Sequence, residues 1–279
     1  MKYKLVPFAL FLITVVFTIS CNKEEINQPP AIPPATTMVI DFGNFNGADK
    51  SVKVNENVIV TKTNWLYSAT SVGLWNVIIG TTFAVPVAAF KSSFSHSPVK
   101  INENTWEWTY SVDGFTSQYT ARLVGEIQSS QVNWKMYVSK DGIDSFDEFL
   151  WFDGVSSTDG KSGEWTLYHS AAFPEKTIEI EWQMDEDQIG NIKYTYVREI
   201  NDSRNPEAFY GSYLTYGLQD DTYDAYVDIH AYSEQKQSFI DTYIEWSRDD
   251  FSGRVKAESF FNDTNWHCWD SNGNDIDCN

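Results

Sequence analysis

The sequence predicts a mainly β protein: a strongly curved antiparallel meander that forms a barrel or half-barrel of about ten to twelve strands, with a short buried helical segment near the N-terminal end. Three observations support this fold class. Apolar and polar residues alternate over most of the chain after residue 105, Asp-Gly and Asn-Gly pairs separate these stretches, and one long segment carries no charge. Together they predict a single β-rich domain over residues 37–279.

The alternation is clear in the stretch that starts at Thr105. Trp106 and Trp108 would share one face of an extended chain, with Glu107 and Thr109 on the other. This one-sided pattern is typical of an antiparallel sheet with one face in the core. Tryptophans in phase with aliphatic neighbours are therefore expected in the core: Trp106, Trp108, Trp134, Trp182 and Trp246.

The uncharged segment runs from Asn64 to Phe90. Its apolar residues surround a helical wheel, which predicts buried helix. We expect two short buried helices with a break between Gly80 and Pro86, because proline interrupts a helix. A membrane-spanning helix and a pair of buried strands are the alternatives. Two short strands are expected before this segment, at 38–45 and 57–61.

A long meander leaves strand edges open unless it closes or pairs with a second sheet. A curved sheet wrapped around the helical segment would hide both the edges and the uncharged residues. In outline this architecture is similar to that of the lipocalins and the periplasmic lipoprotein carriers. The similarity is one of architecture only and implies no activity.

The first 20 residues are typical of a bacterial lipoprotein signal peptide. Lys2 and Lys4 precede an apolar stretch, and small residues stand directly before Cys21. The mature chain is then expected to begin at Cys21 with lipid on its sulfur and amino group. The alternative is an ordinary secretory signal in which Cys21 has no role.

Residues 21–36 are rich in proline and polar residues, with two Pro-Pro pairs at 29–30 and 33–34. Such a segment favours an extended, unpacked chain. We therefore expect a tether over 21–36 that holds the domain away from a membrane.

The net charge of the chain is −19, and removal of the two leader lysines would make it −21. A surface this acidic repels nucleic acid, so nucleic-acid binding is excluded as a function. Besides Cys21, the only cysteines are Cys268 and Cys278, which flank an Asn-Gly turn signal centred on Gly273. We expect them to form a disulfide that closes a C-terminal hairpin.

No motif predicts a metal, a cofactor or a catalytic centre. The four histidines lack a metal-ligand spacing, and no nucleophile elbow or phosphate loop occurs. The acidic tail around Asp270 resembles a calcium loop only in part, because its glycine is misplaced for one. We expect no cofactor, no metal and no catalytic residue, while paired carboxylates on different strands keep a glycan-active hydrolase as the third option.

Aromatic residues out of phase with their aliphatic neighbours are the ligand-binding candidates. A ring that faces solvent on a sheet can stack on a sugar or cover an apolar ligand. Since three positions separate Trp266 from Trp269, one of the two is expected to face outward. The candidates are Tyr137, Phe152, Tyr226, Tyr232, Tyr243, Trp266 and Trp269.

Two sets of residues resemble a known group of proteins. The residues after Cys21, Asn22-Lys23-Glu24-Glu25, resemble the export signal of Bacteroidota-type surface lipoproteins. The stretches 41–43, 84–90 and 253–278 are similar to parts of an uncharacterised, surface-exposed lipoprotein family of that type. The resemblance implies display on the outer face of the outer membrane, with the periplasmic face as the alternative, and implies no known activity.

These observations predict an outer-membrane lipoprotein that binds a glycan or an apolar ligand. The alternative is a structural or accessory subunit of an outer-membrane assembly, and a glycan-active hydrolase comes third. The expected partners are the outer membrane, through the lipid anchor, and a glycan or lipid ligand. An empty apolar pocket would favour binding, since ligand pockets are mostly apolar with few polar groups.

Overall fold

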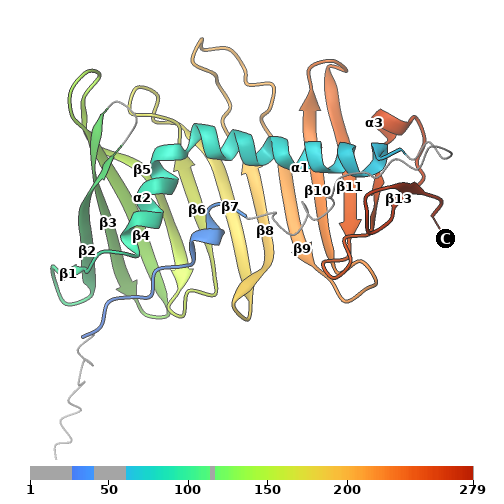
Figure 1. Cartoon of the computed structure of the whole chain (residues 1–279). Coiled ribbons are helices and arrows are strands. Elements are labelled where there is room, and N and C mark those ends of the chain that lie inside the picture. The colour runs from blue at the N-terminus through green and yellow to red at the C-terminus, as the bar shows by residue number, and fades with distance from the viewer. Residues whose placement is uncertain (1–26, 41–60, 114–116, 279) are drawn as a thin grey trace, which may run out of the picture.

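A computed structural model describes residues 27–40, 61–113 and 117–278, and for residues 76–82 the backbone only. Cys21, the leader, most of the expected early strands and the proposed export signal lie outside these residues. The described chain forms one large antiparallel sheet with helices on one face (Figure 1). The prediction of a mainly β meander is therefore confirmed.

Every strand of the sheet pairs with its neighbours in sequence. The fourteen described strands are β1 (Val99–Lys100), β2 (Thr105–Asp113), β3 (Gln118–Gln128), β4 (Gln131–Lys140), β5 (Phe146–Ser157), β6 (Ser162–Tyr168), β7 (Lys176–Asp185), β8 (Gln188–Tyr196), β9 (Tyr213–Leu218), β10 (Ala225–Ser233), β11 (Ser238–Trp246), β12 (Gly253–Lys256), β13 (His267–Trp269) and β14 (Asp275–Ile276).

The expected barrel is not formed by these strands, because β1 and β14 end the strand order without pairing with each other. The strand number also exceeds the expected ten to twelve. The strands at the two ends are only two to four residues long, which is too short for an alternating pattern to reveal. Short edge strands offer little template for pairing with another chain, so the sheet can stay open.

The uncharged segment is helical, as predicted. Helix α1 (Thr63–Thr82) and helix α2 (Ala84–Ser93) meet at Phe83, inside the expected break. Pro86 lies in the first turn of α2, where its missing N–H costs no helical hydrogen bond. α2 covers β2 to β4, and the start of α1 lies against β12 to β14 (Figure 1).

The prediction that these helices are buried on all sides was wrong for α1. Val72 and Trp75 face the sheet, whereas Leu66 and Leu74 are more than half exposed. An open sheet covers only one side of a helix, so the opposite side stays in contact with solvent. None of the helices in the described part of the chain is long and apolar enough to cross a membrane.

Residues 30–40 also pack on the sheet. Pro30 and Pro33 are buried, and a short 3-10 helix, η1 (Ala35–Thr37), follows. The indole N–H of Trp165 on β6 donates to Thr37 Oγ1 at 3.1 Å, and the Ile40 N–H donates to the Tyr194 hydroxyl at 3.2 Å. Residues 30–40 are therefore part of the fold, and the tether expected over 21–36 is shorter at its C-terminal end.

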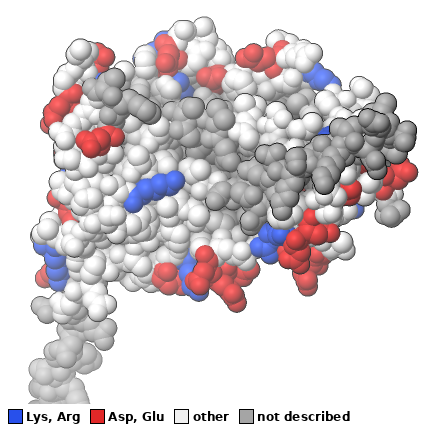
Figure 2. Space-filling model, in the orientation of Figure 1, with Lys and Arg blue, Asp and Glu red and all other residues white. Residues whose placement is uncertain are grey.

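The core lies between the sheet and these covering segments. The tryptophans expected there are all buried, each at most 4% exposed: Trp106, Trp108, Trp134, Trp182 and Trp246. Charged residues gather along the rims of the face in Figure 2, and the described part of its middle shows few charges. The alternation of the sequence thus predicts the inner face of the sheet correctly.

The C-terminal hairpin is closed by the predicted disulfide between Cys268 and Cys278, whose Cα atoms are 5.2 Å apart. Gly273 adopts a φ of +77° in the turn between β13 and β14. Asp270 accepts backbone hydrogen bonds from Asn272 and Asn274, both at 2.9 Å. The acidic tail therefore stabilises a turn, and no group of three metal-ligating side chains occurs in the described residues.

Candidate functional site

An apolar pocket of about 460 Å³ lies between the second half of α1 and strands β7 to β10. Its volume falls in the range of small-molecule sites, roughly 300–1,000 Å³. The sheet, the helix and the loop between β8 and β9 each supply part of the wall. The apolar lining consists of Leu74, Trp75, Phe83, Ile178, Phe209 and Ala231.

Short side chains on the sheet create this space. Thr177, Ser212 and Ala231 line the pocket near the strand ends. Farther along the same face, Ile180 and Ile229 fill the core with larger side chains. The shorter side chains near the strand ends therefore leave space between the sheet and Leu74, Trp75 and Phe83.

Three polar side chains meet at the wall of the pocket: His169 after β6, Tyr196 at the end of β8 and Glu207 in the following loop. Burial and the charge of Glu207 together raise the pKa of the Tyr196 hydroxyl to about 12, against the opposing effect of Arg198. The hydroxyl therefore stays protonated at neutral pH. Glu207 contributes carboxylate oxygens, which accept hydrogen bonds.

His169 presents an unused nitrogen. Its Nε2 lies 3.3 Å from Asp202 Oδ1, and its Nδ1 is buried with no hydrogen-bond partner among the described residues. Assigning the proton of a neutral ring to Nε2, where the carboxylate attracts it, leaves Nδ1 as an acceptor. A buried acceptor without a partner is unusual in proteins, so Nδ1 indicates where a ligand hydrogen-bond donor would bind.

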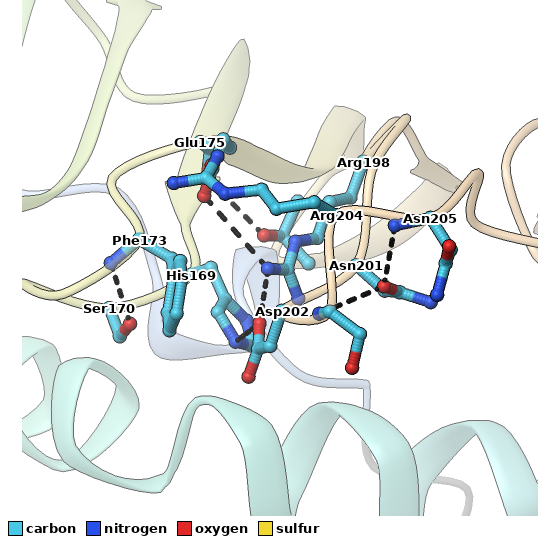
Figure 3. A network of polar contacts seen from close by, with 11 residues as sticks. His169, Ser170, Phe173, Glu175, Arg198, Asn201, Asp202, Arg204 and Asn205 are labelled. Atoms are coloured by element: carbon cyan, nitrogen blue, oxygen red, sulfur yellow. Dashed lines mark hydrogen bonds and ion pairs between the residues drawn. The ribbon is translucent and has the colours of Figure 1, made fainter.

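A network of ion pairs joins the two loops that carry these polar residues (Figure 3). Arg198, whose side chain is only 5% exposed, contacts Asp202 and lies 3.9 Å from Glu175. Arg204 lies 3.4 Å from the other oxygen of Glu175, and its guanidinium is 5.6 Å from the Phe173 ring centroid. The network therefore fastens the loop after β6 to the loop after β8.

The charges in this network reinforce one another. Although burial disfavours the charged form of Arg198, hydrogen bonding and the charge of Asp202 raise the pKa of its guanidinium. The hydrogen bond from Arg198 lowers the pKa of the Asp202 carboxyl, and His169 contributes in the same direction. Both groups stay ionised at neutral pH, so the ion-pair network that joins the two loops persists at that pH.

Two of the predicted ligand-binding residues are in the core. Phe152 and Trp269 are fully buried, and the Trp269 indole N–H donates to the Phe251 carbonyl at 2.8 Å. For Phe152 the reason is a register shift between β4 and β5 next to Tyr137, which reverses the inward and outward positions of β5. Contrary to the expectation that ligand-binding rings face solvent, both of these rings lie inside the core.

Four of the other candidates lie on β10, β11 and the loop before β13. Tyr232 lines the apolar pocket. Tyr226 accepts a hydrogen bond from Asn191 Nδ2 at 3.3 Å, and Trp266 faces outward, as one of the two tryptophans had to. Tyr243 is 39% exposed. Tyr137 stands apart on β4, where the Arg122 guanidinium covers its ring at 4.4 Å.

The sequence did not identify His169, Tyr196 and Glu207 as a group. They come from positions up to 38 residues apart in sequence. They meet only because the C-terminal ends of β6 and β8 lie at the same end of the sheet. One signal in the sequence was available: Thr177, Ser212 and Ala231 are small residues close to strand ends that otherwise place large residues in the core.

Comparison with known proteins adds no further assignment. No family model matches the chain, and no curated protein or solved structure matches it. The candidate site therefore rests on its own geometry.

Proposed function

We propose that this protein is a binding protein for a small apolar molecule with a hydrogen-bond-donating end. The molecule occupies the pocket between α1 and strands β7 to β10. The observation that carries the proposal is an apolar cavity of about 460 Å³ with a few polar groups gathered at one wall. The sequence before Cys21, which is typical of a lipoprotein signal peptide, supports a lipid-anchored location in the outer membrane. The protein would face the exterior, with the periplasmic face as the alternative.

The polar wall favours a ligand that donates hydrogen bonds. Glu207 supplies carboxylate oxygens, and His169 supplies an Nδ1 that accepts in the assigned tautomer. A hydroxyl or amino group satisfies both, whereas a carboxylate would face the negative charge of Glu207. A long-chain alcohol or amine fits this pocket better than the corresponding fatty acid.

The other functions expected from the sequence find less support in this pocket. A glycoside hydrolase needs two carboxyl groups across the bond that it cleaves, and Glu207 is the single carboxylate among the described lining residues. A glycan would meet mostly apolar walls there. An accessory subunit would require no cavity, and it gains support from the exposed Leu66 on α1.

Decanol and decanoate, which differ only in the end group, test the proposal on the full purified chain. Displacement of an environment-sensitive apolar dye should show decanol binding at least tenfold more tightly than decanoate. Glu207→Gln removes the repulsive charge, so it should reduce this preference. Equal binding of the two probes by the unaltered protein would contradict the proposed polarity of the wall.

A variant that fills the cavity tests its location. Ala231→Phe places a ring in the pocket and should reduce decanol binding by more than tenfold. Ala88→Phe is the matched control, because Ala88 is exposed on α2 and adds the same apolar ring outside the pocket. If both variants bind decanol as the unaltered protein does, the pocket is not the ligand site.

A further inference from the structure

A second, polar groove of about 630 Å³ lies beside the part of β11 that β12 does not pair with. It exists because β12 is short. β12 pairs with Tyr243–Trp246 of β11, and the preceding part of β11 has no described strand on that side. The short helix α3 (Glu258–Phe261) and the residues after it form the opposite wall.

Two aromatic rings form the floor of this groove. Phe239 and Tyr243 line it and are 41% and 39% exposed. They lie on the same face of β11, opposite to that of the buried Ile244, and four positions separate them. At about 3.3 Å per residue, their Cα atoms are roughly 13 Å apart.

Neighbouring side chains hold both rings in place. Phe239 stacks on His230 at 4.6 Å between ring centroids, with the planes 2° from parallel, and its edge meets Tyr232 at 5.6 Å. The Lys256 Nζ lies 4.8 Å from the Tyr243 ring centroid. Rings fixed in this way lose little conformational entropy when a ligand binds, which favours affinity.

Polar groups of both signs surround the rings. Asp241, midway between the two aromatic residues, uses Oδ1 to contact His230 Nδ1 at 2.7 Å, so Oδ2 is left for a ligand. Glu258 and Asn262 line the opposite wall, and Asn262 adopts a left-handed φ of 61° at the end of α3. Lys236 and Lys256 balance the two acids, so the groove as a whole carries no net charge.

We propose that this groove binds a neutral oligosaccharide. A sugar ring presents C–H groups of slight positive charge on its faces, which suit the negative face of an aromatic ring, and hydroxyl groups at its edge, which suit carboxylate and amide partners. The groove offers both kinds of partner side by side. Because a single sugar ring cannot reach two aromatic rings about 13 Å apart, the ligand is an oligosaccharide rather than a monosaccharide.

This site is distinct from the apolar pocket, although Phe239 of the groove contacts Tyr232 of the pocket lining. The two are lined by different residues and suit different ligands. An extended peptide that pairs with Ser238–Thr242, on the side where no described strand pairs with β11, is the rival occupant, since open strand edges accept added strands. The charge balance and the exposed rings favour the saccharide, because strand addition depends on the backbone and does not need two aromatic rings.

An array of short β-glucan, mannan, galactan and xylan fragments, probed with the full purified chain, tests the proposal. At least one fragment should bind, with a saturable isotherm by calorimetry. Phe239→Ala and Tyr243→Ala should each weaken that binding about three- to tenfold, which corresponds to the loss of one aromatic contact. Far-ultraviolet circular dichroism should confirm that the variants are folded.

Phe94→Ala is the matched control, since Phe94 is likewise an exposed aromatic residue, and it follows α2, which packs on β2 to β4, far from β11 in strand order. It should bind like the unaltered protein. Equal affinity of all three variants for the fragment would overturn the assignment to this groove. If no fragment on the array binds, the oligosaccharide proposal is overturned, whether or not an extended peptide library binds. The pocket proposal is unaffected by that result.

Discussion

The replacement Asp275→Ala tests how the C-terminal hairpin holds α1. The two carboxylate oxygens of Asp275, on β14, accept the backbone N–H groups of Thr63 and Asn64 at 3.0 Å each. These are the first two residues of α1, whose N–H groups have no partner within the helix. The side chain of Asp275, more than 200 residues away in sequence, thus caps the N-terminus of α1.

The expected cost follows from this geometry. Loss of a capping side chain costs about 1 kcal/mol, and a negative charge at a helix start adds about 0.5 kcal/mol. These two terms sum to about 1.5 kcal/mol, and no further cost is added for the lost hydrogen bonds, because Thr63 is exposed and water replaces part of them. For a domain of this size, the melting temperature should fall by about 3–6 °C.

Urea unfolding followed by tryptophan fluorescence, with the disulfide intact, measures this loss. Asp277→Ala is the control, because Asp277 is exposed in the same hairpin, and it should change stability by less than about 0.5 kcal/mol. Asp275→Asn keeps an acceptor without the charge and should fall between the two. Equal stability of Asp275→Ala and Asp277→Ala would refute the capping role.

The same variant separates stability from binding. Leu74 lies ten residues beyond Asn64 along α1, which corresponds to about 15 Å. Since the effect of a cap is largely confined to the first turn, decanol affinity should stay within about twofold of that of the unaltered protein. A large loss of affinity would mean that the hairpin positions the whole helix.

The remaining predictions concern the anchor and acid stability. Cys21→Ser should abolish metabolic labelling with palmitate and release the protein from the membrane fraction, and labelling that persists would contradict the anchor. Although burial opposes it, hydrogen bonds from Asn274 and Asn272 lower the pKa of the Asp270 carboxyl in the fold. Its stabilising effect is therefore complete above the unfolded value of about 3.9 and is lost as the pH falls through the lower folded value. Between about pH 5 and 2, the unaltered protein should thus lose more unfolding free energy than Asp270→Asn; equal losses would contradict this.

Much of the fold follows from patterns that span only a few residues. Alternation along β2, β4, β7 and β11 predicts which tryptophans are in the core, because a strand can bury only every second side chain. The break at Phe83 follows from the nearby proline, and the Cys268–Cys278 disulfide from a turn signal between two cysteines. Each of these depends on neighbours in the chain.

Other features depend on contacts between residues far apart in sequence. The reversal of Phe152 results from a register shift between two strands, and the open sheet results from very short edge strands. The docking of Thr37 on Trp165 likewise needs the sheet to exist first. No local pattern in residues 27–40 indicates that this proline-rich segment is part of the domain.

The same division applies to the two candidate sites. The residue types could be read from the chain, and Tyr232, Tyr243 and Trp266 were correctly placed outside the deep core. The meeting of His169, Tyr196 and Glu207, and the groove beside α3, depend on which strand ends coincide and how far β12 extends. Side-chain alternation is a property of one strand, whereas a pocket is a property of several elements, so only the tertiary structure brings these groups together.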